Sequence, residues 1–428
     1  MTATSPAATT QTAPPETADP FHGPRANRRR WQALAVLFFA QMTALGSISY
    51  GFSVLLKPLA ADFGLPRATV NWGLMTVLIG MAAFAPVVGR ALDRMPGRRI
   101  VMIGAVLFAA GWAAIAHSTS VFGALLAAFF LLAPGGTALG PVVASTLISR
   151  WFSERRGLAL GISAVAMSTG GVIAVPILAM LIEGGGWRNA VTIYGLTGAG
   201  IILLLALRVL PAAYPAPRPA GPVTERAAEA APETEPQPWA QRDFWLIAGA
   251  VGLIIGSNGA LLSCLVAYAT DRGFSLAQGT ALVSLVSGGA VVGKLALGGL
   301  SDRTAARWLY LVVVGLTVLL LGTLLAQPAY PVLFAIALLS GAAVGGGMPL
   351  WTVMVGRRFG LAHMGRAMGL MSTAMLPFNL GGLHLVGATY DASGSYATAF
   401  QLFLGAVLLA GLLVLPVKGI GRPTPLGG

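Results

Sequence analysis

The sequence predicts an all-α membrane protein with twelve transmembrane helices in two six-helix bundles. Hydrophobic residues make up 56% of its 428 residues and charged residues only 10%, whereas soluble proteins carry about 25% charged residues. Apolar runs recur along the chain, and each is long enough to cross a bilayer, which needs about 20 helical residues. A polar segment separates these runs into two sets of six, which predicts two bundles.

The first bundle is expected over residues 31–210, after a polar tail at residues 1–30. The tail is rich in Ala, Thr and Pro, which predicts disorder. No signal peptide is expected, because the first apolar run begins only at Trp31 and is too long for the apolar core of one. The six spans of this bundle are predicted at 31–57, 69–90, 99–117, 120–149, 157–182 and 187–210.

Residues 211–241 are rich in Pro, Ala and Glu and have no apolar periodicity. This composition predicts a flexible linker between the bundles. The second bundle is expected over residues 242–417, and residues 418–428 form a short C-terminal tail. Its spans are predicted at 243–270, 276–300, 307–326, 329–355, 365–389 and 396–417.

The basic residues are distributed very unevenly between the two sides of the predicted membrane. Of the 27 Lys and Arg residues, 22 lie on the side of the termini and the linker, and Lys294 lies within a span. By the positive-inside rule, both termini are expected in the cytoplasm of a multi-pass protein of the cell inner (plasma) membrane. The same asymmetry explains the net charge of +13 without nucleic acid as a partner. The four basic residues on the opposite side are Lys57, Arg67, Arg188 and Arg272.

The two halves share a charged motif after their second span. Gly89–Arg94 (GRALDR) follows span two, and Gly298–Arg303 (GGLSDR) follows span eight. Internal repeats joined by a linker are typical of two-bundle transporters. With Gly97–Arg99 downstream, the first motif resembles the loop signature of the major facilitator superfamily, with one extra residue. The resemblance covers residues 31–417 and implies the fold of that superfamily.

A narrower resemblance concerns three other stretches. Arg150–Gly161 is similar to the entry of helix five in monocarboxylate transporters and their oxalate/formate antiporter relatives, and Tyr50–Leu59 is similar to the end of their first helix. Lys294 stands where those families place a cationic substrate residue, more often Arg. The match is incomplete: Ala290 replaces the acidic residue of the animal transporters, Tyr50 replaces their lysine, and span eleven contains no lysine. The resemblance therefore does not fix the substrate.

Lys294 is the first candidate for binding a substrate. An ionisable group inside a span costs roughly 3 kcal/mol and usually faces a cavity. None of the 14 acidic residues lies in the middle of a predicted span, so an anionic ligand is the group that would neutralise this lysine. The alternative is that the long side chain of Lys294 only reaches the cytoplasmic interface.

Four further polar residues are candidates for the same site. His384 can protonate near neutral pH and carry a coupling proton. For each of the four, the alternative is a hydrogen bond that only joins neighbouring helices, and Gln41 is a weaker candidate of the same kind. The four residues are Tyr50, Asn258, Asn379 and His384.

A second group of charged residues belongs to the cytoplasmic loops. The resemblance implies that they form a charge latch between helix ends, which would hold the outward-facing state, and the alternative is that they only anchor the topology. The residues of this expected cytoplasmic gate are Asp93, Arg94, Arg98, Arg99, Asp302 and Arg303.

We therefore expect a secondary active transporter of a small organic anion, with a monocarboxylate as the preferred class. It would work by alternating access, with proton symport or anion exchange. The alternative is an exporter of hydrophobic or drug-like compounds on the same fold, and a sensor without transport is disfavoured by the short tails. The sequence contains no nucleophile, metal-ligand or nucleotide-binding motif, so no enzyme activity and no cofactor are expected. The single cysteine, Cys264, excludes an internal disulfide. No obligatory protein partner is expected.

Overall fold

The structure, a computed structural model, describes residues 26–152, 155–211, 237–301 and 303–420, and no side chains at 26, 238 and 361–366. These described residues are almost entirely helical and contain no strand. Most of the expected N-terminal tail, most of the linker, most of the C-terminal tail and Asp302 lie outside them.

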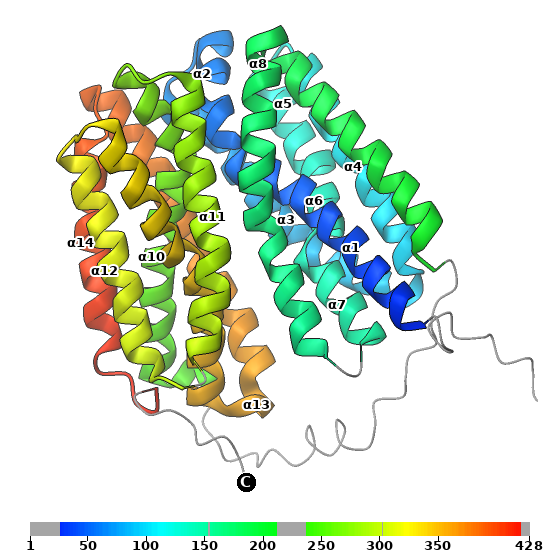
Figure 1. Cartoon of the computed structure of the whole chain (residues 1–428), viewed down its shortest axis with the longest axis vertical. Helices are drawn as coiled ribbons and strands as arrows, with labels where there is room; N and C mark the ends of the chain where they lie inside the picture. The colour runs from blue at the N-terminus through cyan, green and yellow to red at the C-terminus, as the bar shows by residue number, and fades with distance from the viewer. Residues whose placement is uncertain (1–25, 153–154, 212–236, 302, 421–428) are drawn as a thin grey trace, which may run out of the picture.

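The first half of the chain forms one bundle, shown in blue to green in Figure 1. Its first span changes from α-helix to a five-residue π-helical turn and back, and a comparable turn interrupts the fourth span. Such turns inside α-helices often occur at functional sites. The elements are α1 (Ala26–Leu45), η1 (Gly46–Tyr50), α2 (Phe52–Phe63), α3 (Arg67–Arg94), α4 (Gly97–His117), α5 (Val121–Ala127), η2 (Ala128–Leu132), α6 (Ala133–Leu139), α7 (Pro141–Trp151) and α8 (Arg156–Val209).

The second half forms the other bundle, shown in green to red in Figure 1. Its elements are η3 (Pro238–Ala240), α10 (Arg242–Asp271), α11 (Leu276–Ser301), α12 (Ala306–Leu325), α13 (Tyr330–Ser393) and α14 (Ala397–Val414).

Two of these helices are each long enough to cross a membrane twice, and each has a break in its middle. The backbone of α8 leaves the helical conformation at Gly185 and Gly186, and that of α13 leaves it at Gly360. Gly186 has a φ of 76° and Gly360 a φ of 72°, a left-handed region that glycine enters without a steric cost. Among the described residues, ten helices are long and apolar enough to cross a membrane, with α8 counted once and α13 counted only up to Gly360. The predicted fold class, with twelve spans in two six-helix bundles, is therefore confirmed.

The first helix of each half lies at the centre of the molecule. In the most apolar 18 residues of the first span, 72% of the residues are buried. The corresponding fraction is 83% for α10 and only 22% for α3. Around these central helices the two halves meet where α2 packs on α10. They also meet along two lines, where α8 packs on α11 and α3 packs on α13. We call these lines the α8–α11 seam and the α3–α13 seam.

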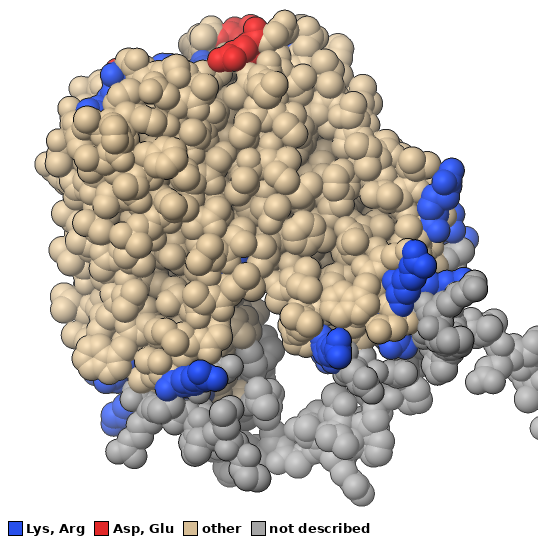
Figure 2. All heavy atoms as spheres, viewed as in Figure 1, with Lys and Arg blue, Asp and Glu red and all other residues tan. Residues whose placement is uncertain are grey.

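The molecule has two distinct ends. The linker end holds the ends of α3 and α7 near Arg94 and Trp151, and the far end holds those of α2 and α10 near Phe63 and Asp271. In Figure 2 basic side chains gather toward the linker end, at the lower edge, while the surface between the ends carries almost no charge. Large apolar side chains such as Phe122 and Met180 are exposed on it, as expected where helices face lipid.

Candidate functional site

Lys294 is positioned by the close packing of α11 on α13. A Cβ atom added to Gly293 would lie 2.2 Å from the carbonyl oxygen of Ala342, and one added to Gly289 would lie 2.1 Å from that of Leu338. Only glycine allows this backbone approach. Because successive residues of a helix are rotated by about 100°, Lys294 is turned away from α13 and toward α8.

The ammonium group of Lys294 reaches across the α8–α11 seam to the other half. Its Nζ donates a hydrogen bond of 2.7 Å to the carbonyl oxygen of Ala164. The preceding residue, Ser163, accepts a hydrogen bond of 2.7 Å from Nε2 of the buried Gln41 on α1. No ion pair between described residues includes Lys294. The lysine is therefore a cation between the two halves whose hydrogen-bond acceptor is neutral.

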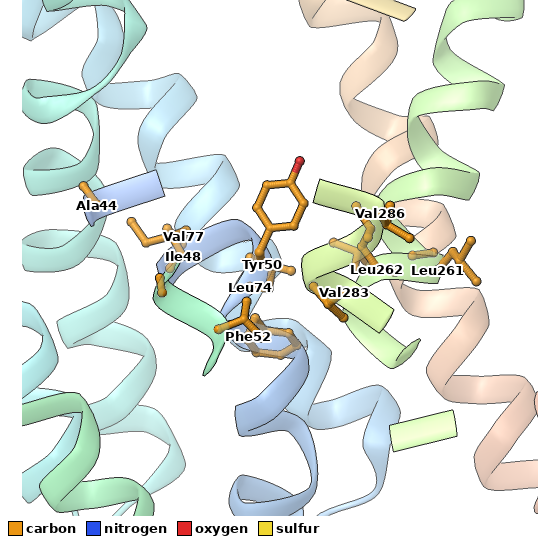
Figure 3. Packing of buried hydrophobic residues seen from close by; sticks show 14 of the residues in the cluster. Ala44, Ile48, Tyr50, Phe52, Leu74, Val77, Leu261, Leu262, Val283 and Val286 are labelled. Atoms are coloured by element: carbon orange, nitrogen blue, oxygen red, sulfur yellow. The ribbon is translucent and has the colours of Figure 1, made fainter. Parts of the chain in front are cut away.

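Tyr50 lies on the same seam, nearer the far end. It belongs to the π-helical turn η1 and is buried. A Cβ atom at Gly171 on α8 would lie 2.8 Å from Cγ of Tyr50 and 2.2 Å from Oγ of Ser287 on α11, so these three residues meet where the halves touch. Figure 3 shows the ring standing between the helices of the first half and Val286 of the second. Ser287, which lies next to Tyr50, is seven residues before Lys294 on α11, about 10 Å along the helix axis. Tyr50 and Lys294 therefore lie on the same seam but are not in direct contact.

Asn258 and Asn379 lie together inside the second half. Asn258 on α10 is 6% exposed, and its Oδ1 has no hydrogen-bond partner. Oδ1 of Asn379, on α13, is 3.1 Å from the position that a Cβ atom of Gly259 would take. Asn379 therefore lies at the contact of α10 with α13, beside the residue that follows Asn258 and apart from the contacts of Lys294.

His384 lies on the other line of contact, the α3–α13 seam. Its side chain is exposed, and its ring centroid is 6.3 Å from that of Trp72 on α3. On the same seam, Nδ2 of Asn71 donates a hydrogen bond of 2.7 Å to the carbonyl oxygen of Leu383. His384 therefore contacts neither Lys294 nor Tyr50 in this conformation.

The expected cytoplasmic gate residues lie at the linker end. Oδ1 of Asp93 is 3.0 Å from NH2 of Arg150, so this ion pair joins two helices of the same half. Arg94, Arg99 and Arg303 are exposed and Arg98 is half-buried, while Asp302 lies outside the described residues. That these residues latch the two halves together stays a prediction.

A cluster of charged residues at the far end does join the halves. The carboxylate of Asp271, from the second half, accepts two hydrogen bonds from the guanidinium of Arg67, at 2.7 and 3.1 Å. It also accepts one from Nζ of Lys57, at 2.9 Å. The side chains of Arg67 and Asp271 are only 13% and 25% exposed, and bidentate pairs of this kind are among the stronger hydrogen bonds in proteins.

A second carboxylate, that of Asp391, holds the start of α3. It accepts hydrogen bonds from the backbone amides of Arg67 and Ala68, at 2.9 and 2.8 Å. The residue before the helix, Pro66, provides no side-chain cap. An aspartate from the second half thus caps a helix of the first half, where the free amides and the helix dipole favour negative charge.

Two tyrosines complete this cluster. The guanidinium of Arg67 donates to the hydroxyl of Tyr396 and lies 3.7 Å from the ring centroid of Tyr390. Both tyrosines belong to the second half, so every partner of the Arg67 side chain named here is across the contact. We define the far-end cluster as Lys57, Arg67, Asp271, Tyr390, Asp391 and Tyr396.

The two ends of the molecule therefore differ in how the halves meet. Of the ion pairs between described residues, two join the halves, and both belong to the far-end cluster. The pairs at the linker end, Asp93 with Arg150 and Asp243 with Arg358, each stay within one half. In Figure 2 the surface is continuous at the far end and hollowed between the halves at the lower edge. This conformation is closed at the far end and open toward the linker end.

Sequence reasoning missed the far-end cluster, although it noted two of the members. Lys57 and Arg67 are half of the basic residues assigned to that side. Their scarcity there is the signal that could have identified them, because a cation retained on the side that holds few of them is a candidate for a specific ion pair. Gln41, the weaker candidate, donates a hydrogen bond to Ser163, the residue before the acceptor of Lys294.

Comparison with known proteins gives one family. The family model described as Major Facilitator Superfamily matches residues 36–375 and 257–427. Monocarboxylate transporter 11 of Homo sapiens is 28% identical over 93% of this chain and 84% of its own length. Monocarboxylate transporter 13 of Rattus norvegicus is 27% identical over 90% of this chain and 89% of its own length. Among solved structures, a bacterial homologue of the human lysosomal transporter Spinster gives a TM-score of 0.70 at 14% identity, covering 94% of this chain and all of that one.

Proposed function

Because the chain belongs to the Major Facilitator Superfamily, whose members move small molecules across membranes, we propose that it is a secondary active carrier of a small organic anion. Monocarboxylates are the first class to test. The observation that carries the proposal is Lys294, a cation on the contact between the halves whose hydrogen-bond acceptor is a neutral carbonyl. The names of the two curated relatives support the same class of substrate.

An anion suits this position for an electrostatic reason. A charged group within the membrane is costly unless it is paired, and every acidic residue on the described spans lies near a helix end. A carboxylate bound to Lys294 would provide the missing counter-charge. Because Lys294 lies on α11 and its acceptor Ala164 on α8, a ligand that replaces this hydrogen bond would contact both halves. Tyr50 lines the same seam and is proposed to border the path toward the far end.

Transport would proceed by alternating access, in which the halves rock about the bound anion. The described conformation would be the inward-facing state, with the basic linker end in the cytoplasm. The far-end cluster would close the outer side, and its carboxylates would separate from Lys57 and Arg67 when the carrier turns outward. Proton symport and anion exchange both remain compatible with this arrangement.

One observation favours a second candidate, an exporter of hydrophobic compounds. A cavity of about 90 Å³ in the first half is lined almost entirely by apolar residues of η1, α2, α3, α4, α5 and η2. It lies inside one half, however, whereas alternating access needs a site that both halves contact. We therefore retain the anion carrier as the proposed function.

The test is transport by purified protein in liposomes against a panel of L-lactate, pyruvate, a neutral sugar and a lipophilic cation. We expect uptake of the carboxylates alone, and at least a 20-fold loss in Lys294→Ala. Lys418→Ala is the matched control, since Lys418 is exposed at the linker end, and should retain uptake. Full carboxylate uptake by Lys294→Ala would refute the site, and transport of the cation instead would favour the exporter.

A further inference from the structure

The charges of the far-end cluster are divided by sign between the halves, with the cations in the first half and the carboxylates in the second. Both cations, Lys57 and Arg67, belong to the first half, and the carboxylate of Asp271 that they share belongs to the second. The third basic residue of the first half at this end, Arg188, already has its own partner within that half, Asp62, at 2.7 Å. When the halves separate, Lys57 and Arg67 are the two cations that lose their counter-ion.

The two cations bind the Asp271 carboxylate with the contacts that a carboxylate-binding site would make to a free ligand. One guanidinium contacts both carboxylate oxygens, and one ammonium contacts the Oδ1 oxygen from another side. Oγ1 of Thr270 accepts a further hydrogen bond from Lys57, at 3.0 Å. This geometry recognises a carboxylate group as such, so a free carboxylate can replace the side chain of Asp271 once that side chain has moved away.

A crevice leads inward from Lys57, one of these two cations. A cavity of about 210 Å³ lies between the halves and is lined by Lys57, Ser53 and Ile182 of the first half and by Val266 and Thr270 of the second. Ser53 is one helical turn deeper than Lys57 and three residues from Tyr50. The crevice therefore lies between the far-end cations and the part of the α8–α11 seam that Tyr50 occupies.

We propose that Arg67 and Lys57 form an outer entry site for the anionic substrate, which takes the place of Asp271 when the far end opens. This inference rests on the proposed function, since it assumes an anion that crosses by alternating access. The far-end cluster then has two roles: it closes the outer side in the described state, and its cations attract and hold the carboxylate in the opposite state. Two adjacent cations also raise the local concentration of anions, an effect that salt weakens.

The two roles can be separated because two variants break the same ion pair from opposite sides. Asp271→Asn removes the carboxylate and leaves both cations, whereas Arg67→Gln removes one cation. Both variants weaken the closed far end and raise the outward-facing fraction, which by itself lowers the apparent KM for external substrate. Asp271→Asn breaks both ion pairs between the halves and Arg67→Gln breaks only one. A difference in that KM therefore reports the entry site only where it exceeds the difference in outward-facing fraction, which alkylation of Ser53→Cys measures for each variant.

The experiment measures initial uptake of L-lactate by intact bacterial cells that express the protein and lack lactate carriers of their own. We expect the external KM of Arg67→Gln to be at least tenfold higher than that of Asp271→Asn, and Arg67→Lys to fall between them. The KM of Asp271→Asn should rise with added salt more steeply than that of Arg67→Gln. Lys57→Gln, judged by the same criteria, replaces Arg67→Gln if that variant does not reach the membrane.

Equal external KM values for Asp271→Asn and Arg67→Gln, within twofold, would overturn the entry site and leave only the closing role. That result would not affect the proposed function, because Lys294→Ala tests it separately. Absence of L-lactate, pyruvate and all other carboxylate transport by the unaltered protein would instead refute the proposed function.

Discussion

The far end and the linker end of this protein both contain arginine–aspartate pairs, but among the described residues only the far end has one that joins the two halves, Arg67 with Asp271. Arg67 and Asp271 come from different halves, and their side chains are 13% and 25% exposed. Arg150 and Asp93 come from the same half, and Asp93 is 71% exposed. Exposed pairs contribute little, whereas breaking a more buried pair leaves an uncompensated charge. The contribution of ion pairs to the contact between the halves is therefore concentrated at the far end.

The largest expected effect follows from Asp271→Asn, which breaks both ion pairs between the halves. Loss of these charge-assisted bonds should destabilise the state with a closed far end by about 2 to 3 kcal/mol. The equilibrium would then shift roughly 30- to 150-fold toward the outward-facing state. The readout is alkylation of Ser53→Cys by a membrane-impermeant maleimide added outside, in a Cys264→Ala background. The buried Cys264 is the single native cysteine.

Charge reversal provides the control for this variant. Arg67→Asp combined with Asp271→Arg should recover slow alkylation in part, because the pair is restored in the opposite sense. Fast alkylation in the unaltered background would show that the far end is already open.

Asp391→Ala should have a smaller effect, because it removes a helix cap and no ion pair. Loss of an N-cap costs about 1 kcal/mol, so we expect a shift of roughly fivefold. Hydrogen exchange of the Arg67 and Ala68 amides should become faster, since Asp391 accepts hydrogen bonds from both. Unchanged exchange at these two amides would show that the contact between the halves does not depend on this cap.

Tyr396→Phe should have a smaller effect again. The substitution removes the hydroxyl that accepts from Arg67 and retains the ring, and one such bond contributes about 0.5 to 1 kcal/mol. The alkylation rate of Ser53→Cys should rise about two- to fivefold. A rise as large as that of Asp271→Asn would mean that the tyrosine, and not the ion pair, dominates the far-end contact.

The smallest effect is expected for Asp93→Asn at the linker end. Its ion pair lies within one half and is exposed, so the thermal stability of the described conformation should change by less than about 0.5 kcal/mol. If the cytoplasmic latch exists, the same variant should instead shift the carrier toward the inward-facing state. Faster external alkylation of Ser53→Cys in this variant would contradict the latch.

Much of the architecture could be predicted from the sequence because it depends on local properties. Apolar run length determines where a helix can cross the membrane, and the predicted span 276–300 agrees with α11 at Leu276–Ser301. The predicted boundary between spans five and six agrees with the break at Gly185 and Gly186. The position of Lys294 on a face turned from α13 also follows from the adjacent glycines, although its acceptor on α8 does not.

The contacts between the halves could not be predicted, because their partners are far apart in the chain. Arg67 and Asp271 are separated by 204 residues, and helical periodicity assigns a residue to a face without identifying the helix opposite. For the same reason the sequence predicts one site that contains both His384 and Lys294. The structure places these two residues on different seams. The π-helical turn at Tyr50 also has no sequence signature in the pattern of apolar residues.

The most direct test of this difference between the ends is a pair of distance measurements by electron–electron double resonance. Spin labels at Ala61→Cys and Ala392→Cys report the far end, and labels at Arg94→Cys and Arg303→Cys report the linker end, all at exposed positions of opposite halves. In the Cys264→Ala background we expect a single short distance at the far end. Asp271→Asn should lengthen that distance and shorten the one at the linker end. Distances at the two ends that stay unchanged, or that move in the same direction, would contradict a far end that closes the carrier.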